Sequence, residues 1–273
     1  MNVRTFLSRH PAVTYFVLAY GISWSGAFLL VAPRLFRGES LQKMDGLMMF
    51  PLMLLGPFIA SLLLTGIMEG RAGLRDLFSR IGSQRTGRQW YAAALFIPPC
   101  LILIVLLLLS IWVSPDYTPN HFTIGLLFGT GAGFFEEIGW MGYAFPKMRL
   151  KLGAVSAPVI LGLLWGLWHL PVIDFLGAAT PHGGYWALFC MAFIALLTAM
   201  RVLIAWISTH TTSILPAMLM HASSTGSLAM LGPFHVTAGQ ETLWYAVYAA
   251  ALWIVAAIVI LRSGLKEQPA IGQ

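Results

Sequence analysis

The sequence predicts an all-α protein, a polytopic bundle of about eight transmembrane helices that forms a single domain over residues 1–273. Two observations predict this fold class. Hydrophobic residues make up 58% of the chain and charged residues only 10%, whereas soluble domains carry about 25% charged residues. The apolar residues are also gathered into segments of roughly 20 residues, the length that crosses a bilayer as a helix.

The apolar segments follow one another with short connections, too short for a separate soluble domain. The first segment is too long for a removable signal peptide, and no small-residue cleavage site follows it. The eight expected spans are residues 12–33, 46–68, 90–113, 122–145, 154–176, 185–208, 213–235 and 243–262.

The basic residues predict the orientation of these spans. Of the 16 Lys and Arg residues, twelve fall on the side of both termini, three on the opposite side, and Arg201 within a span. Cytoplasmic loops carry an excess of Lys and Arg, so both termini are expected in the cytoplasm. The compact loops are typical of a bacterial cytoplasmic membrane protein. This distribution explains the net charge of +6, so no nucleic-acid partner is expected.

Glu136 and Glu137 are adjacent in the fourth expected span. A single ionised carboxylate at the centre of a bilayer costs at least ~2.5–3.5 kcal/mol. Anchoring in lipid requires neither side chain, so the pair indicates proton or water chemistry, metal binding or ion passage. Adjacent helical residues point about 100° apart. One glutamate is therefore expected to face a substrate and the other a neighbouring helix.

Two other spans contain a histidine, His169 in the fifth and His221 in the seventh. Buried polar groups need partners, and the nearest partners are one another. We therefore expect both histidines to cluster with Glu136 and Glu137. Thr225 follows His221 by one turn and shares its face.

Three further residues are expected to support this cluster. Trp140 lies on the face of Glu136, and Trp165 precedes His169 by one turn. Arg201 is the only Lys or Arg that lies inside an expected span and not at its end, so we expect it near Glu137. The remaining histidines stand at span ends or in loops, where solvation is expected to explain them: His10, His121, His182, His210 and His235.

The expected depth of the cluster bears on substrate entry. Counted at 1.5 Å per residue, Glu136 and His221 both lie about 12–14 Å from the cytoplasmic edge. A substrate is therefore expected to enter from the cytoplasmic side or laterally from the lipid.

Three segments resemble motifs of the CAAX-protease and bacteriocin-processing (CPBP, or ABI) family of intramembrane proteases. That family carries Glu-Glu-x-x-x-Arg, aromatic-x-x-x-His and His-x-x-x-Asn motifs on three membrane helices. The corresponding segments here are Glu136-Glu137-Ile-Gly-Trp-Met141, Trp165-Gly-Leu-Trp-His169 and His221-Ala-Ser-Ser-Thr225. Order and spacing agree, and the resemblance covers roughly residues 120–228.

The resemblance implies an intramembrane endopeptidase that acts on a membrane-associated peptide or protein, such as a prenylated CAAX protein or a leader-type peptide. Glu136 would activate a water as general base, His169 would hold this water, and His221 with Thr225 would stabilise the oxyanion. Glu136, His169 and His221 also match a catalytic zinc site in kind, though not the H-E-x-x-H spacing. One divalent metal ion is therefore an open alternative.

Two positions depart from the family motifs. Met141 stands where the family has Arg, and Thr225 where it usually has Asn. These departures motivate an alternative, a catalytically impaired relative that binds a peptide or a partner membrane protein. A second alternative is a transporter or proton relay, because Glu–His clusters in membranes also serve that function.

Overall fold

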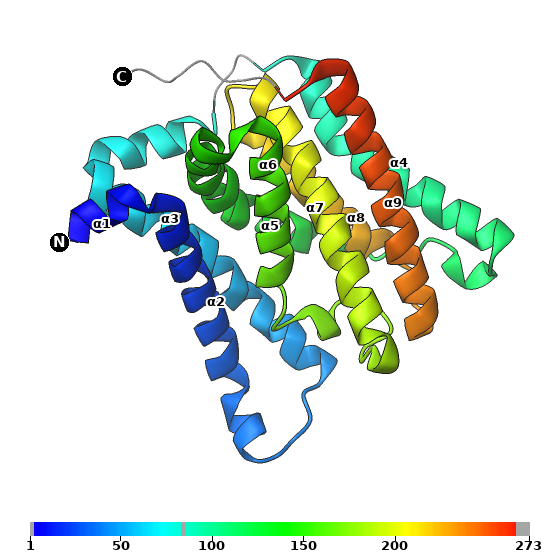
Figure 1. Cartoon of the computed structure of the whole chain (residues 1–273). Helices are drawn as coiled ribbons and strands as arrows, with labels where there is room; N and C mark the ends of the chain where they lie inside the picture. The colour runs from blue at the N-terminus through cyan, green and yellow to red at the C-terminus, as the bar shows by residue number, and fades with distance from the viewer. Residues whose placement is uncertain (1–2, 83–85, 266–273) are drawn as a thin grey trace.

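The computed structural model describes residues 3–82 and 86–265, and these ranges contain helices but no strand (Figure 1). The long helices are α2 (Pro11–Phe36), α3 (Lys43–Ser79), α4 (Arg88–Trp112), α5 (Gly125–Gly139), α6 (Phe145–Trp168), α7 (Trp186–His210), α8 (Leu215–Leu231) and α9 (Ala238–Ser263). Shorter segments are α1 (Val3–Arg9), the π turn η2 (Trp140–Ala144) and the 3-10 turns η1 (Pro115–Tyr117), η3 (Ile173–Phe175) and η4 (Gly183–Tyr185).

Helices α2 to α9 correspond in order to the eight expected spans, which confirms the all-α bundle. In the described chain, six segments are long and apolar enough to cross a membrane. One of them, Gly125–Trp168, contains both α5 and α6. Helix α8, with 17 residues, is shorter and is not among the six. The protein is therefore an integral membrane protein.

Two glycines bend the chain out of the bundle. Gly70 within α3 and Gly153 within α6 have φ angles of 66° and 80°, a region that favours glycine because it has no Cβ. Residues 71–79 and 145–152 therefore form separate helical arms at the same end of the bundle. The arm of α3 carries Arg71 and Arg75, two of the basic residues that are expected on the cytoplasmic side.

The expected fifth span, 154–176, is too long. Helix α6 ends at Trp168, and the chain then turns through residues 169–172. Pro171 explains the early end, because a proline disfavours the helical conformation of the residue before it. His169 is consequently the C-cap residue of α6 and does not lie within the helix.

Close packing of α5 on α8 brings the glutamates beside His221. A Cβ at Gly129 would lie 2.3 Å from the carbonyl oxygen of Ala222, and one at Gly133 would lie 2.4 Å from that of Met218. Only glycine allows the two backbones to approach so closely, as small residues do in membrane helix packing. Glu136 follows Gly133 by less than one turn, so this contact fixes its position.

The π turn η2 directly follows the two glutamates. Pro146 has no amide hydrogen, so the carbonyl of Gly142 lacks its usual donor four residues later. Arg80 Nη2 supplies a donor instead, at 3.0 Å. Wide turns of this kind are frequent at functional sites.

The bundle has two distinct ends. Helix α1, the last turn of α9 and the arms 71–79 and 145–152 lie at one end, which we call the terminal end (Figure 1). The α2–α3, α4–α5, α6–α7 and α8–α9 connections lie at the opposite end, which we call the loop end.

Candidate active site

A buried ion pair joins α5 to α7. Arg201 Nη1 lies 2.8 Å from Glu137 Oε1 and 2.7 Å from Oε2, and both side chains are fully buried. The guanidinium also stacks 4.1 Å over the Trp165 ring. The expected proximity of Arg201 and Glu137 is confirmed. Arg201 thus supplies from another helix the counter-charge that Met141 does not provide.

Glu137 also contacts the histidine of α8. His221 Nδ1 lies 2.7 Å from Glu137 Oε1. This contact fixes the imidazole ring and leaves Nε2 as the nitrogen that remains for a substrate or water. Glu137 therefore positions His221 and does not itself line the cavity described below, although its place in the motif suggested a catalytic role.

Glu136 is held by two tryptophans. The indole nitrogens of Trp140 and Trp165 donate to the same oxygen, Glu136 Oε2, at 3.0 and 2.7 Å. Both indoles are buried, and Glu136 is only 1% exposed. Because Oε2 already receives two donors, Oε1 is the oxygen that remains for a water molecule. The expected support by Trp140 and Trp165 is therefore seen as direct hydrogen bonds.

His169 lies at the end of α6, within an aromatic enclosure. Its Nδ1 lies 2.8 Å from the carbonyl oxygen of Trp165, and its ring packs against Trp168 and Phe193. As with His221, the engaged nitrogen is Nδ1 and the remaining one is Nε2. In both histidines, Nε2 is therefore the ring nitrogen that remains for a water molecule or a substrate.

A cavity of about 370 Å³ brings these side chains together. Its wall includes Glu136, His169, His221, Thr225 and Trp165, from α5, α6 and α8. Most of the remaining wall is apolar apart from Lys43 and Glu241, as in many small-molecule and peptide sites. The expected clustering is confirmed for these residues. Trp140 and Arg201 are absent from this lining and act from behind it.

The same residues do not fit a zinc ion as they are arranged. Among the described residues, no group of three His, Cys, Asp or Glu side chains could hold a metal ion. The Oε2 atom of Glu136 is already occupied by two indole N–H groups. The divalent metal ion at Glu136, His169 and His221 stays an untested alternative, and no chemical step of the proposed reaction depends on it.

A second polar cluster near the cavity was not expected from the sequence. Glu241 of α9 accepts hydrogen bonds from the backbone nitrogens of Ala178 and Ala179, at 2.8 and 2.7 Å. His182 lies between Asp174 and Glu241, at 3.0 and 3.4 Å. The prediction that His182 is solvated is wrong, because the ring is stacked on Phe189 and only 1% exposed.

This cluster ties the α6–α7 connection onto α9 beside the cavity wall. Burial alone would lower the pKa of His182, but the Glu241 and Asp174 carboxylates raise it above its ordinary value. No sequence signal marked the cluster. Glu241 lies in the first turn of α9, where acidic residues are common because they interact favourably with the helix dipole.

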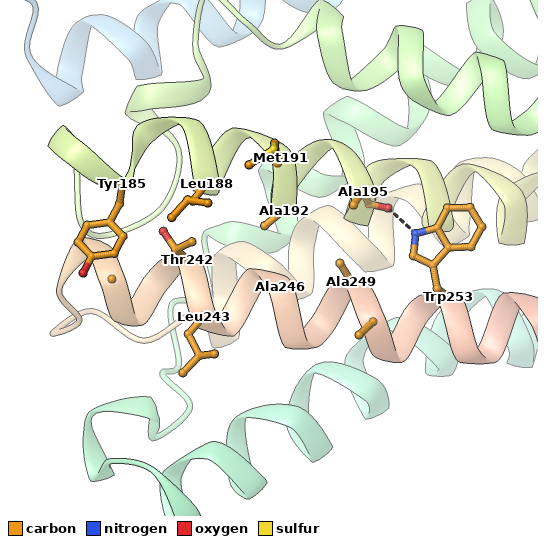
Figure 2. Close-up of a pocket in the computed structure, with 12 residues that line it drawn as sticks. Tyr185, Leu188, Met191, Ala192, Ala195, Thr242, Leu243, Ala246, Ala249 and Trp253 are labelled. Carbon is orange, nitrogen blue, oxygen red and sulfur yellow. Dashed lines mark hydrogen bonds between the residues drawn. The ribbon is translucent and has the colours of Figure 1, made fainter.

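A groove between α7 and α9 is larger, at about 570 Å³, but holds no comparable chemistry (Figure 2). Small and apolar residues line it, among them Ala192, Ala246 and Ala249. One polar contact crosses its end, from Trp253 Nε1 to the carbonyl oxygen of Ala195 at 3.1 Å. None of Glu136, His169 and His221 lines this groove. The smaller cavity is therefore the candidate reaction site.

Comparisons with known proteins agree with this site. Residues 118–227 match the family described as type II CAAX prenyl endopeptidase Rce1-like, and this range contains every candidate site residue. The chain is also similar to CAAX prenyl protease 2 of Methanococcus maripaludis, with 24% identity over 261 residues that cover 90% of each protein. The resemblance drawn from the three motifs is therefore confirmed. Both comparisons support a membrane-embedded protease.

Proposed function

We propose that the protein is an intramembrane endopeptidase that hydrolyses a peptide bond with a water activated by Glu136. The observation that carries the proposal is a carboxylate whose Oε2 is fixed by two indole donors, in a cavity wall shared with His169 and His221. A general base requires such a position within hydrogen-bond reach of the water it deprotonates.

The proposed reaction assigns one task to each side chain. Glu136 takes a proton from the water while the water oxygen attacks the scissile carbonyl carbon. His169 holds the water, while Thr225 and the imidazolium form of His221, which carries a hydrogen on Nε2 as well as on Nδ1, donate hydrogen bonds to the oxyanion that forms. Glu136 then gives its proton to the leaving nitrogen as the carbon–nitrogen bond breaks. Glu137 keeps His221 in place through Nδ1, much as a carboxylate orients the histidine of a catalytic triad.

The proposed substrate is a peptide segment of a membrane-associated protein, prenylated or of leader type. A largely apolar wall and a position within the helix bundle both support a substrate that is already held at the membrane. The name of the archaeal relative supports a prenylated CAAX peptide as one member of this class.

The alternative of an impaired relative rested on Met141 and Thr225. The contact of Arg201 with Glu137 weakens the first reason, because the carboxylate has its counter-charge. Thr225 still lines the cavity and offers a hydroxyl donor in place of an amide. The similarity to a prenyl endopeptidase family and to a prenyl protease supports hydrolysis over a transporter or proton relay.

The test is cleavage of a peptide library by purified protein in detergent, comparing wild type with Glu136→Gln. The substitution keeps the shape of the side chain but removes the base, so turnover should fall by about 10²–10⁴-fold. Glu39→Gln, at an exposed position of the α2–α3 connection, is the matched control and should keep full activity. Cleavage by Glu136→Gln at near wild-type rate would disprove the glutamate mechanism.

A further inference from the structure

The cavity opens at one end of the bundle only. Beyond the catalytic side chains, its wall continues to Lys43 and Leu47 at the start of α3, to residues 176–178 and to residues 232–234. All of these belong to the loop end (Figure 1). No described residue of the terminal-end arms, 71–79 and 145–152, lines the cavity. A substrate therefore reaches Glu136 from the loop end.

The charges of the two ends differ in sign. In the described ranges, ten basic and two acidic residues lie at the terminal end, against three basic and five acidic residues at the loop end. The basic residues of the terminal end are Arg4, Arg9, Arg71, Arg75, Arg80, Arg88, Lys147, Arg149, Lys151 and Arg262. The excess of Lys and Arg in short loops marks the cytoplasmic side of a membrane protein.

Together these observations reverse the expected route of the substrate. We infer that the cavity opens to the extracytoplasmic side of the membrane, so that the substrate is a membrane-anchored peptide presented from that side. The statement about a substrate rests on the proposed function. The direction in which the cavity opens is independent of that function. This inference replaces the expected entry from the cytoplasmic side, because the cavity faces away from the end that the basic residues place in the cytoplasm.

The opening is suited to a peptide at a lipid surface. Phe122 and Phe234 pack edge to face with ring centroids 6.0 Å apart, and they are 38% and 53% exposed. Leu47, also in the wall, is 42% exposed. Lys43 is exposed there, and its Nζ bonds the neutral carbonyl oxygen of Gly177. Apolar side chains of a peptide that enters here would contact these rings.

The inference separates the substrate classes. A carboxy-terminal peptide that is prenylated in the cytoplasm would meet the terminal end, which carries no opening in the described chain. An exported leader or the outer part of a membrane-anchored protein would meet the cavity directly. The inferred substrate is therefore of the second kind.

The direction of the opening is tested by labelling single cysteines with a membrane-impermeant maleimide on intact cells. Cys100 and Cys190 are free, so Cys100→Ala with Cys190→Ala provides the background. Glu39→Cys at the loop end should be labelled on intact cells. Arg75→Cys, an exposed position of the terminal end, should be labelled only after the cells are permeabilised. The opposite pattern would overturn the inference.

A second measurement needs no change in the helices. Green fluorescent protein fused after Gln273 of the otherwise unaltered chain fluoresces only if it folds in the cytoplasm, and fluorescence is the expected result. A dark fusion, with the full-length protein detected in the membrane, would place the terminal end outside and overturn the inference.

Vesicles of defined orientation separate this inference from the proposed function. A peptide cleaved in detergent should also be cleaved when added to right-side-out vesicles, and at least tenfold more slowly with inside-out vesicles. Cleavage by inside-out vesicles alone would overturn the inference and leave the protease intact. Absence of cleavage even in detergent would count against the protease, while the labelling result still decides the direction of the opening.

Discussion

Replacing Arg201 by Met should strongly destabilise the protein. The guanidinium and the Glu137 carboxylate are both 0% exposed and 2.7 Å apart, so removal of one partner leaves an uncompensated charge in the bundle. Loss of one member of a buried pair costs about 3–5 kcal/mol. For chains of this size about 1 kcal/mol shifts the melting temperature by about 2–4 °C, so Arg201→Met should lower it by about 6–20 °C.

The assay is thermal unfolding of purified protein in detergent, followed by tryptophan fluorescence. Arg75→Met, at an exposed position of the α3 arm, is the matched control and should change the stability by less than about 0.5 kcal/mol. Combining Arg201→Met with Glu137→Gln removes both charges, so the double variant should be more stable than Arg201→Met alone. The glutamine keeps an acceptor oxygen for His221.

A second combination tests whether Arg201 replaces the arginine of the family motif. Met141→Arg introduces a guanidinium four residues after Glu137, within reach of its carboxylate. Arg201→Met should therefore be less harmful in a Met141→Arg background. The reasoning is refuted if Arg201→Met unfolds within error of the Arg75→Met control, because the ion pair would then contribute nothing measurable.

The remaining predictions concern activity, metal content and pH. His169→Ala should lower turnover on the order of 10²-fold, because a displaced water loses its alignment with the scissile carbonyl. The rate of peptide cleavage measures this loss. Active protein should contain well under one zinc ion per chain by elemental analysis and keep its rate in EDTA; one zinc per chain with EDTA-sensitive cleavage would contradict this. The folded pKa of His182 lies above its usual 6.5, so its stabilising contribution should be complete below about pH 6.5 and fade as the pH rises through the folded value. His182→Gln should remove the contribution of His182 to the pH dependence of the melting temperature. An unchanged dependence in this variant would contradict the raised pKa of His182.

The sequence determined the architecture and the chemical content of the site. Apolar segments of bilayer length leave helices as the solution, because every backbone polar group in lipid must be paired within its own segment. Glu136, Glu137, His169, His221 and Arg201 are costly in such helices. Their clustering was therefore predictable from energy alone, and Trp140 and Trp165 followed from helical spacing.

Only the tertiary structure decided which polar atoms pair and where the cavity opens. The contact of Arg201 with Glu137 joins residues 64 positions apart, and the approach of α5 to α8 depends on glycines packed against a distant backbone. Helical periodicity gives the face of each side chain but not the rotation of one helix against another. The cluster of His182 and Glu241 carried no local signal, since Glu241 lies in α9 and its partners lie in the α6–α7 connection, so that they meet only after the helices have packed.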